Sequence, residues 1–311
     1  MNTVNLRFKS NRVRDIIQLF HEELDAPYGS GEVTVFCAML FESFLGWDKV
    51  RLMTSREETI NQSDLLRFHW ALEDLKQHRP IQHIIGYTDF CGCRIEVNPD
   101  VLIPRPETEE MVEWIITTLN SQLSPEGRRP SVEPTLNFLD LCTGSGCIAI
   151  ALKKAFPLSM VTAVDLSEAA LATARRNAHN NGVEVRFVKG DILGMGSDQS
   201  DGSDMSDWSD TFSIIVSNPP YICDRERVAM RRNVLDYEPE MALFVPDNDP
   251  LRFYKAIASI ARQRLQRDGL LVVEINEAFS EEVCALFREQ GLQPQLHEDF
   301  RGKPRWVSAS R

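Results

Sequence analysis

A glycine-rich turn between an apolar run and a helical pattern restricts the fold of this chain more than any other feature. Residues 137–141 form an apolar run of strand length, and residues 147–154 form a helical pattern that ends before Pro157. The turn between them consists of Cys142, Thr143, Gly144, Ser145 and Gly146. Strand, glycine turn and helix make the nucleotide-binding half of a doubly wound sheet, because glycine lets the backbone approach a ligand closely. The sequence therefore predicts an α/β domain with a ligand site at this turn.

Acidic residues follow the next two predicted strands. Asp165 directly follows the predicted strand at residues 159–164, and Asp191 and Ile192 come shortly after the one at residues 185–188. Asp165 can accept hydrogen bonds from both ribose hydroxyls of an adenosyl ligand, Asp191 from the adenine amino group, and Ile192 can pack on the ring. Each aspartate alone could equally be a helix cap or a turn residue. Because they stand at successive strand ends, an adenosyl pocket is favoured.

A fourth predicted strand, residues 212–216, leads to the tetrapeptide Asn218, Pro219, Pro220 and Tyr221. Both prolines fix φ, lack an N–H group and favour an extended conformation in the residue before them. The Asn218 side chain offers an acceptor and the Tyr221 ring a flat face, so the loop can hold a planar NH2 group. The alternative for such a tetrapeptide alone is a proline-rich turn after a strand. The adenosyl pocket predicted upstream favours the NH2 site.

A dinucleotide-dependent dehydrogenase is the competing interpretation of the glycine turn. Its fingerprint carries a third small residue, and Ala149 meets that requirement here. A dehydrogenase has no use for the Asn-Pro-Pro-Tyr sequence after the fourth strand. The ordered set of turn, aspartates and tetrapeptide at successive strand ends is therefore specific and disfavours a dehydrogenase.

With these motifs the chain resembles the class I S-adenosylmethionine-dependent methyltransferases, and more narrowly the PrmC/HemK family of glutamine N5-methyltransferases that modify peptide chain release factors. Three further segments carry the resemblance: residues 80–87, residues 98–110 with the Ile-Pro-Arg-Pro-Glu-Thr-Glu signature, and residues 299–305. It is clear from about Pro80 to the end and weak in the first 80 residues. The family usually has glycine where this chain has Cys142. A sister family, which methylates a large-subunit ribosomal protein, has a sequence similar to this chain at that position, so the glycine turn does not separate the two families. The sister family diverges after Pro-Arg, so the Pro-Glu-Thr-Glu block separates the two.

The resemblance implies a fold and a set of site residues. The fold is a Rossmann-like seven-stranded α/β methyltransferase domain (residues 105–311), preceded by a helical substrate-recognition domain (1–85) and a β-hairpin linker (86–104). Asn218, Pro219 and Tyr221 are the expected catalytic residues, and together with Pro220 they bind the substrate amide. The expected ligands of S-adenosyl-L-methionine are Asp140, Cys142, Thr143, Gly144, Ser145, Gly146, Asp165, Asp191, Ile192 and Asn218.

The implied reaction is methyl transfer to the glutamine of the Gly-Gly-Gln motif in class I release factors. The alternatives are a glutamine methyltransferase of a ribosomal protein, an adenine N6-methyltransferase, and an inactive adenosyl-binding scaffold. The 46 acidic and 34 basic side chains give a net charge of −12, which opposes binding to a phosphate backbone, and a Lys/Arg-rich recognition segment is missing. No direct nucleic-acid binding is therefore expected, and the intact tetrapeptide argues against a scaffold.

The remaining expectations concern organisation and location. Residues 10–78 show apolar stripes at helical spacing, which predict the core of a small bundle, or less often a docking face for a partner. Pro106 is expected to begin a helix that Thr108 or Glu107 caps, and residues 197–210 to form a solvated Ser/Asp-rich insertion. Without an apolar run of about 18 residues or a signal-peptide core, we expect no membrane span and a cytoplasmic location. A monomer is also expected. The seven cysteines lack metal-ligand spacing, so reduced thiols and no metal site are expected.

Overall fold

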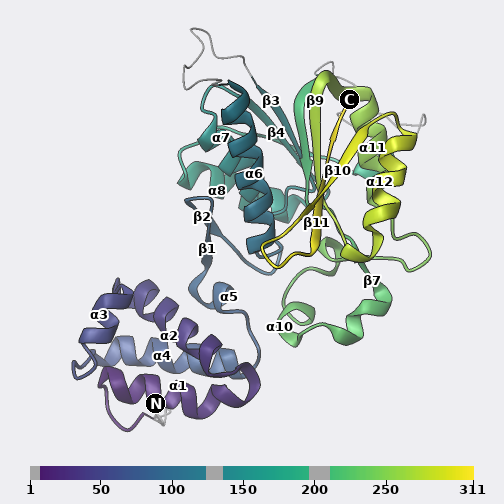
Figure 1. Cartoon of the computed structure of the whole chain (residues 1–311). Helices are drawn as coiled ribbons and strands as arrows, with labels where there is room; N and C mark the ends of the chain where they lie inside the picture. Colours follow the sequence, from purple (N-terminus) through teal and green to yellow (C-terminus); the bar gives the residue numbers. More distant parts are fainter. Residues whose placement is uncertain (1–7, 124–135, 196–210) are drawn as a thin grey trace. The chain divides into compact units, whose positions relative to one another are not determined.

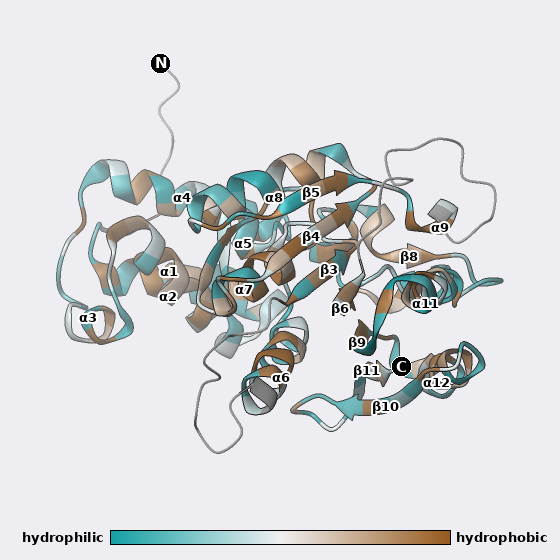
Figure 2. Cartoon of the chain, turned by 90° about the horizontal axis from the view of Figure 1, so that it is seen from above, coloured by the Kyte–Doolittle hydropathy of each residue, from teal (hydrophilic) through white to brown (hydrophobic). Residues whose placement is uncertain are grey.

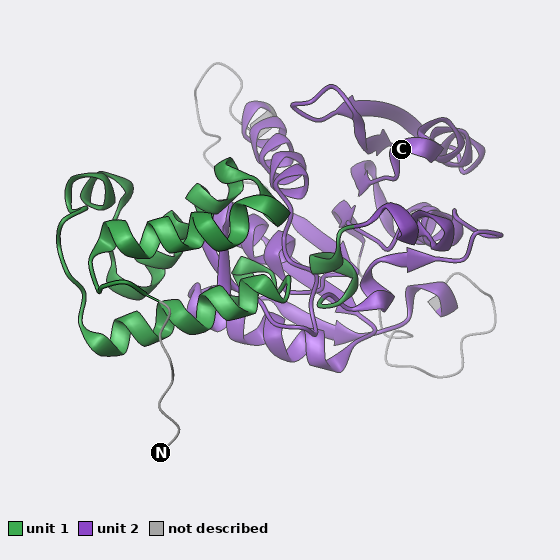
Figure 3. Ribbon diagram, turned by 90° about the horizontal axis from the view of Figure 1, so that it is seen from below, with its two compact units in different colours: residues 1–86, 231–237 green, residues 87–230, 238–311 purple. Residues whose placement is uncertain are grey.

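The chain forms two compact units in the computed structural model, which describes residues 8–123, 136–195 and 211–311 (Figure 3). Unit 1 comprises residues 1–86 and 231–237, and unit 2 comprises residues 87–230 and 238–311. The Ser/Asp-rich insertion expected at 197–210 lies outside the described residues, as does the start of the chain, where a signal peptide was considered. In the described parts of the chain, no helix is both long and apolar enough to cross a membrane.

Unit 1 is a helical bundle whose core is made by the predicted stripes (Figure 1). Its helices are α1 (Val13–Tyr28), α2 (Ser30–Leu45), α3 (Lys49–Thr54), α4 (Gln62–Lys76), α5 (Ile81–Ile85) and α10 (Arg232–Leu235). The stripe residues that are buried together are Val13, Ile16, Ile17, Phe20, Leu24, Phe36, Leu40, Phe41, Leu65, Phe68, Leu72 and Leu75. Phe44 is partly buried against them. The prediction of a packed core is thus confirmed for these stripes.

A short segment from far along the sequence completes unit 1. Residues 231–237, which include α10, group with the amino-terminal helices rather than with their sequence neighbours. The Tyr237 hydroxyl donates to the Gln77 carbonyl at 2.8 Å, and Arg231 pairs with Glu32 at 3.2 Å. The chain that leaves the Asn-Pro-Pro-Tyr sequence therefore contributes to the helical unit before it returns to unit 2, an arrangement that the sequence did not predict.

Unit 2 is built on a seven-stranded sheet, which confirms the α/β fold class. In spatial order its strands are β10 (Gln293–Glu298), β11 (Pro304–Ser310), β9 (Leu265–Glu274), β6 (Phe212–Ser217), β3 (Asn137–Leu141), β4 (Met160–Asp165) and β5 (Arg186–Lys189). β11 runs antiparallel to both of its neighbours, and the other pairings are parallel. Every strand predicted from an apolar run is present. The edge strand β10 was not predicted, because its sequence is mostly polar and contains Pro294, which is tolerated only at an edge.

Helices cover both faces of this sheet, with two hydrophobic clusters between the layers. α6 (Pro106–Leu123), α7 (Cys147–Ala155) and α8 (Glu168–Asn180) pack on one face, and α11 (Arg252–Arg264) and α12 (Ser280–Glu289) on the other. Figure 2 shows the mostly apolar central strands between these helices. Phe138 faces the first cluster, whereas Leu139 and Leu141 face the second. This alternation explains the continuous apolar run, since a parallel strand is buried on both faces.

The predicted hairpin is present and belongs to unit 2. β1 (Tyr87–Phe90) pairs antiparallel with β2 (Cys93–Glu96) across a two-residue turn, in which Cys91 and Gly92 both have positive φ. Such a turn matches the twist of hairpin strands. The Glu96 N–H donates to Asn177 Oδ1 at 2.7 Å, and Asn177 Nδ2 donates to the Ser145 carbonyl at 2.9 Å. The hairpin is therefore tied through α8 to the glycine turn.

Candidate active site

A cavity of about 330 Å³ lies at the carboxyl ends of β3, β4, β5 and β6. The predicted site residues that line it are Cys142, Thr143, Gly144, Ser145, Asp165, Asp191, Ile192, Asn218 and Pro220. Asp140, Gly146, Pro219 and Tyr221 are not among its lining residues. The parallel strands thus bring the glycine turn, both aspartates and the start of the Asn-Pro-Pro-Tyr sequence to one hollow, as expected from the sheet topology.

The glycine turn has a backbone conformation that few residues adopt. Cys142, Gly144 and Gly146 all have positive φ, at 60°, 55° and 81°. A Cβ atom on Gly146 would also lie 3.0 Å from the Ala174 Cβ, so close packing of α7 against α8 requires glycine there. Cys142 carries a side chain in this left-handed region, at a typical cost of about 1–2 kcal/mol. Glycine, which the resembling family usually has at this position, carries no such cost.

Asp165 fastens the glycine turn to the end of β4. One carboxylate oxygen accepts from the Gly144 N–H at 2.8 Å, and the other from the Ser167 N–H at 2.9 Å. Burial raises the pKa of Asp165, while these backbone hydrogen bonds lower it. Each carboxylate oxygen has a second lone pair, so Asp165 can still accept from a ligand. Asp165 is thus a turn residue that also lines the cavity, and its role as a ribose ligand stays a prediction.

Asp191 and Ile192 shape the cavity at the end of β5. Asp191 is exposed and its Oδ1 accepts from the Leu193 N–H at 3.0 Å, where the short helix α9 (Ile192–Met195) begins. Ile192 is buried and lines the cavity beside it. A carboxylate next to an apolar side chain suits a flat heterocycle that carries an amino group.

Asp140 lies beneath the turn, fully buried and outside the cavity lining. Its Oδ2 accepts from the Thr143 hydroxyl at 2.5 Å and from the Ala149 N–H at 3.2 Å. Burial raises the pKa of Asp140 to about 7. These contacts support a structural role, in which Asp140 holds the turn against the start of α7.

The stability of Asp140→Asn relative to wild type is expected to increase as the pH rises from about 4 to about 7. The folded pKa of about 7 lies above the ordinary value of 3.8. The wild-type free energy of unfolding therefore falls as the pH rises between these values, by up to about 1.4 kcal/mol per pH unit. Asparagine has no such proton to lose and keeps an acceptor for Thr143 and Ala149. Melting temperatures across this range, beside those of the exposed Asp89→Asn, measure the effect. A difference from wild type that does not vary with pH would contradict it.

A chain of hydrogen bonds runs from the Asn218 side chain to a buried carboxylate at the end of β9. Asn218 Nδ2 donates to the Thr108 hydroxyl at 3.0 Å, and that hydroxyl donates to Glu274 Oε2 at 2.6 Å. The Tyr221 hydroxyl donates to Glu274 Oε1 at 2.9 Å. Burial raises the pKa of Glu274, while the hydroxyls of Thr108 and Tyr221 and the Arg305 guanidinium counteract it. Glu274 thus holds Tyr221 directly and Asn218 through Thr108.

One expectation about this region needs correction. Thr108 and Glu107 do not cap α6, because the helix begins at Pro106, whose missing N–H needs no partner at a first helical position. The Thr108 hydroxyl is used by Glu274 instead. Tyr221 is not among the residues that line the cavity, and its hydroxyl donates to Glu274. The bond from Asn218 to Thr108 joins the Pro-Glu-Thr-Glu block to the tetrapeptide.

Sequence reasoning missed three buried polar residues around the site. Glu274 is 1% exposed, and Glu238 accepts from the Ile103 N–H at 3.0 Å and from Arg105 at 2.6 Å. Asn276 Nδ2 donates to the Tyr221 carbonyl at 3.1 Å. Glu274 alone had a recognisable signal, an acid that closes an apolar strand, which is the same signal that singled out Asp165.

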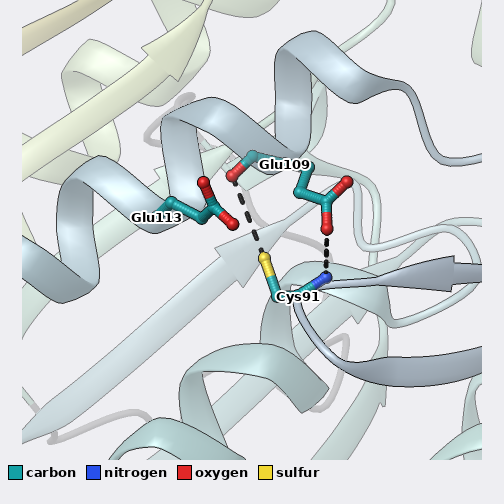
Figure 4. Close-up of side chains that lie close together, drawn as sticks. All are labelled: Cys91, Glu109 and Glu113. Atoms are coloured by element: carbon teal, nitrogen blue, oxygen red, sulfur yellow. Dashed lines mark hydrogen bonds between the residues drawn. The ribbon is translucent and has the colours of Figure 1, made fainter.

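Cys91, Glu109 and Glu113 form a cluster between the hairpin turn and α6, away from the cavity lining (Figure 4). The Cys91 N–H donates to Glu109 Oε1 at 2.6 Å, and its thiol lies 3.9 Å from the Glu109 carbonyl oxygen. Burial, followed by the charges of Glu109 and Glu113, raises the pKa of the Cys91 thiol. The bond from the Cys91 N–H to Glu109 fastens the hairpin turn to α6.

Comparison with known proteins assigns both parts of the chain to described families. Residues 116–236 match the family model of the methyltransferase small domain, and residues 28–86 match that of the PrmC N-terminal domain. Three similar proteins are each named release factor glutamine methyltransferase. The protein from Flavobacterium psychrophilum is 38% identical over 94% of this chain and 96% of its own length. Those from Bacteroides thetaiotaomicron and Streptococcus pneumoniae are 37% and 40% identical, over 97% and 88% of this chain and 100% and 90% of their own lengths.

Proposed function

This chain belongs to the release factor glutamine methyltransferase family, and we propose that it methylates the glutamine side-chain amide in the Gly-Gly-Gln motif of class I peptide chain release factors. The methyl donor is S-adenosyl-L-methionine, and the methyl group goes to the amide nitrogen N5. One observation carries the proposal: the glycine turn and Asn218 line the same cavity, so a donor and an acceptor can meet there.

The cavity has the size and the chemistry for the cofactor. Its volume of about 330 Å³ lies within the range of about 300–1,000 Å³ that is usual for small-molecule sites. Asp165 offers acceptors for the ribose hydroxyls, Asp191 for the adenine amino group, and Ile192 a surface for the ring. Cys142, Thr143, Gly144 and Ser145 would pass close to the methionine part, with Gly146 and Asp140 fixing the turn. When bound, the cofactor supplies an activated methyl group.

The tetrapeptide would hold the substrate amide. Asn218 Oδ1 and the Pro219 carbonyl would each accept one hydrogen of the glutamine NH2 group. This orients the nitrogen lone pair towards the methyl group and favours the pyramidal nitrogen of the transition state. Pro220, which lines the cavity, would pack against the amide plane. Tyr221 would act by holding the loop through Glu274, and the proton released after transfer would leave to water.

We propose that the helical domain, residues 1–85, recognises the release factor. The match of residues 28–86 to the PrmC N-terminal domain supports this assignment. Val50 and Met53 on α3 and Trp70 on α4 are large apolar side chains that remain more than half exposed. They provide apolar surface that the bundle core does not use, as a protein-binding surface requires. The hairpin at 86–104 would join this domain to the methyltransferase domain at 105–311, and the enzyme would act as a cytoplasmic monomer.

A substrate panel tests the proposal. The purified chain is incubated with radiolabelled S-adenosyl-L-methionine and one of three substrates: a class I release factor, a large-subunit ribosomal protein fraction, or adenine-containing DNA and RNA. We expect label in the release factor alone. Label only in the ribosomal fraction, or only in nucleic acid, would contradict the release factor assignment and identify that material as the substrate.

A further inference from the structure

The hydrogen bonds behind Asn218 have a direction that a single carboxylate determines. Thr108 has one hydroxyl hydrogen, which it gives to Glu274 Oε2. The distance of 2.6 Å lies in the usual range for a hydroxyl that donates to a carboxylate oxygen. Having used its hydrogen, the Thr108 oxygen can only accept, and it accepts from Asn218 Nδ2 at 3.0 Å. The Asn218 amide nitrogen is therefore occupied by Thr108, and the amide oxygen is the atom left for a ligand in the cavity.

We propose that Glu274 is a positioning residue for methyl transfer, which acts through Thr108 to make Asn218 present its amide oxygen, rather than its NH2 group, to the substrate. The inference rests on the proposed function, because it is the NH2 group of a glutamine that needs an acceptor at this place. Glu274 itself does not line the cavity, whereas Thr108 and Asn218 do. Its effect on the substrate is therefore transmitted by hydrogen-bond polarity.

A neutral side chain at position 274 would reverse the chain of hydrogen bonds. In Glu274→Gln, the hydroxyl of the partly buried Tyr221 still needs an acceptor, so the glutamine oxygen faces Tyr221 and the glutamine NH2 faces Thr108. Thr108 then accepts from residue 274 and donates its hydrogen to Asn218. To accept that hydrogen, Asn218 must turn its oxygen to Thr108, which leaves its NH2 group facing the cavity. The NH2 group of Asn218 would then face the NH2 group of the substrate glutamine. Both groups are donors, so no hydrogen bond forms between them and the substrate amide is held poorly.

The reversed chain suits a carboxylate at position 218. In Asn218→Asp alone, the single hydrogen of Thr108 is shared between two carboxylates, and one of them loses its donor. In Asn218→Asp combined with Glu274→Gln, Tyr221 donates to residue 274, residue 274 donates to Thr108, and Thr108 donates to the new carboxylate at position 218. Every buried group has a partner, and the second oxygen of that carboxylate faces the substrate NH2 group. The second substitution should therefore repair the first.

The test compares methylation of a release factor by five full-length proteins: wild type, Asn218→Asp, Glu274→Gln, the double variant, and Asn218→Asp with Glu238→Gln as the matched control. Glu238 is a buried carboxylate like Glu274, at 5% and 1% exposure, but has no bond to Thr108. Each single substitution is expected to lower kcat/KM about 10- to 100-fold, as for a buried group left without its partner. The double variant is expected to exceed Asn218→Asp at least about tenfold, and the control to show no recovery.

Dissociation constants of the release factor, measured without cofactor, are expected to rank the variants in the same order as kcat/KM. A substrate amide without its acceptor at position 218 already weakens binding of the release factor. A double variant no better than Asn218→Asp would overturn the inference while leaving the proposed function intact. A wild-type protein that methylates no release factor would overturn both.

Thr108 provides a second test that does not depend on the folding of the Glu274 variant. Thr108→Ser keeps the hydroxyl and is expected to stay within about threefold of wild type, whereas Thr108→Val loses about tenfold or more in kcat/KM. Melting temperatures of both variants serve as the folding control. Equal losses in the two variants would mean that packing, rather than the hydroxyl, is what Thr108 contributes, and would contradict the inference.

Discussion

Asn218→Ala is expected to lower kcat/KM for release factor methylation by about 10²- to 10³-fold, the usual cost of removing one preorganised hydrogen-bond partner of a transition state. The Asn218 amide oxygen is the acceptor proposed for the substrate NH2 group, and alanine offers none. The cofactor should still bind within about tenfold of wild type, since the glycine turn and Asp165 are untouched. Initial rates at varied release factor concentration, together with calorimetric titration of S-adenosyl-L-methionine, separate the two effects.

A matched variant and a clear contrary outcome accompany this prediction. Asn248→Ala removes an exposed asparagine that does not line the cavity, and its activity should equal that of wild type. If Asn218→Ala retained more than about a third of wild-type activity, the amide oxygen would not be an essential acceptor. If it lost activity and cofactor binding to the same degree, Asn218 would act mainly on the cofactor.

Asp165→Ala is expected to weaken S-adenosyl-L-methionine binding by about 100-fold, the second largest effect. The carboxylate accepts from the Gly144 and Ser167 N–H groups, so its loss leaves two backbone donors without partners at the edge of the cavity. Each such donor typically costs about 1–3 kcal/mol. The proposed acceptor for the ribose hydroxyls is lost at the same time.

Equilibrium titration of the cofactor measures this effect, with Asp89→Ala, an exposed aspartate in the hairpin, as the control. Asp165→Asn should fall between wild type and Asp165→Ala, because an amide oxygen replaces only one of the two acceptors. Unchanged cofactor affinity in Asp165→Ala, with a lowered melting temperature, would restrict Asp165 to supporting the turn.

The sequence predicted the sheet and the cavity because both depend on local patterns. A parallel strand buried on two faces is a continuous apolar run, as in residues 137–141, and the residue after each run stands at the ligand edge. For β10 the pattern fails, since a strand at the sheet edge is only partly buried and tolerates Pro294 and polar residues. Composition alone cannot distinguish such a strand from a loop.

The supports behind the cavity could not be predicted, because they depend on contacts between distant positions. Thr108, Asn218 and Glu274 stand on three different segments, and only the packing of α6 against the ends of β6 and β9 brings them together. The capping prediction for Thr108 was wrong for the same reason, since a local role was assigned to a hydroxyl whose partner lies far along the chain. Residues 231–237 likewise group with helices more than 150 positions away, as the bond from Tyr237 to Gln77 shows.

Tandem mass spectrometry of a class I release factor, after incubation with this protein and S-adenosyl-L-methionine, tests the central claim most directly. We predict one added methyl group on the side-chain nitrogen of the Gly-Gly-Gln glutamine, absent when Asn218→Ala replaces wild type. An unmodified glutamine, from a protein that binds the cofactor in the same experiment, would contradict the account.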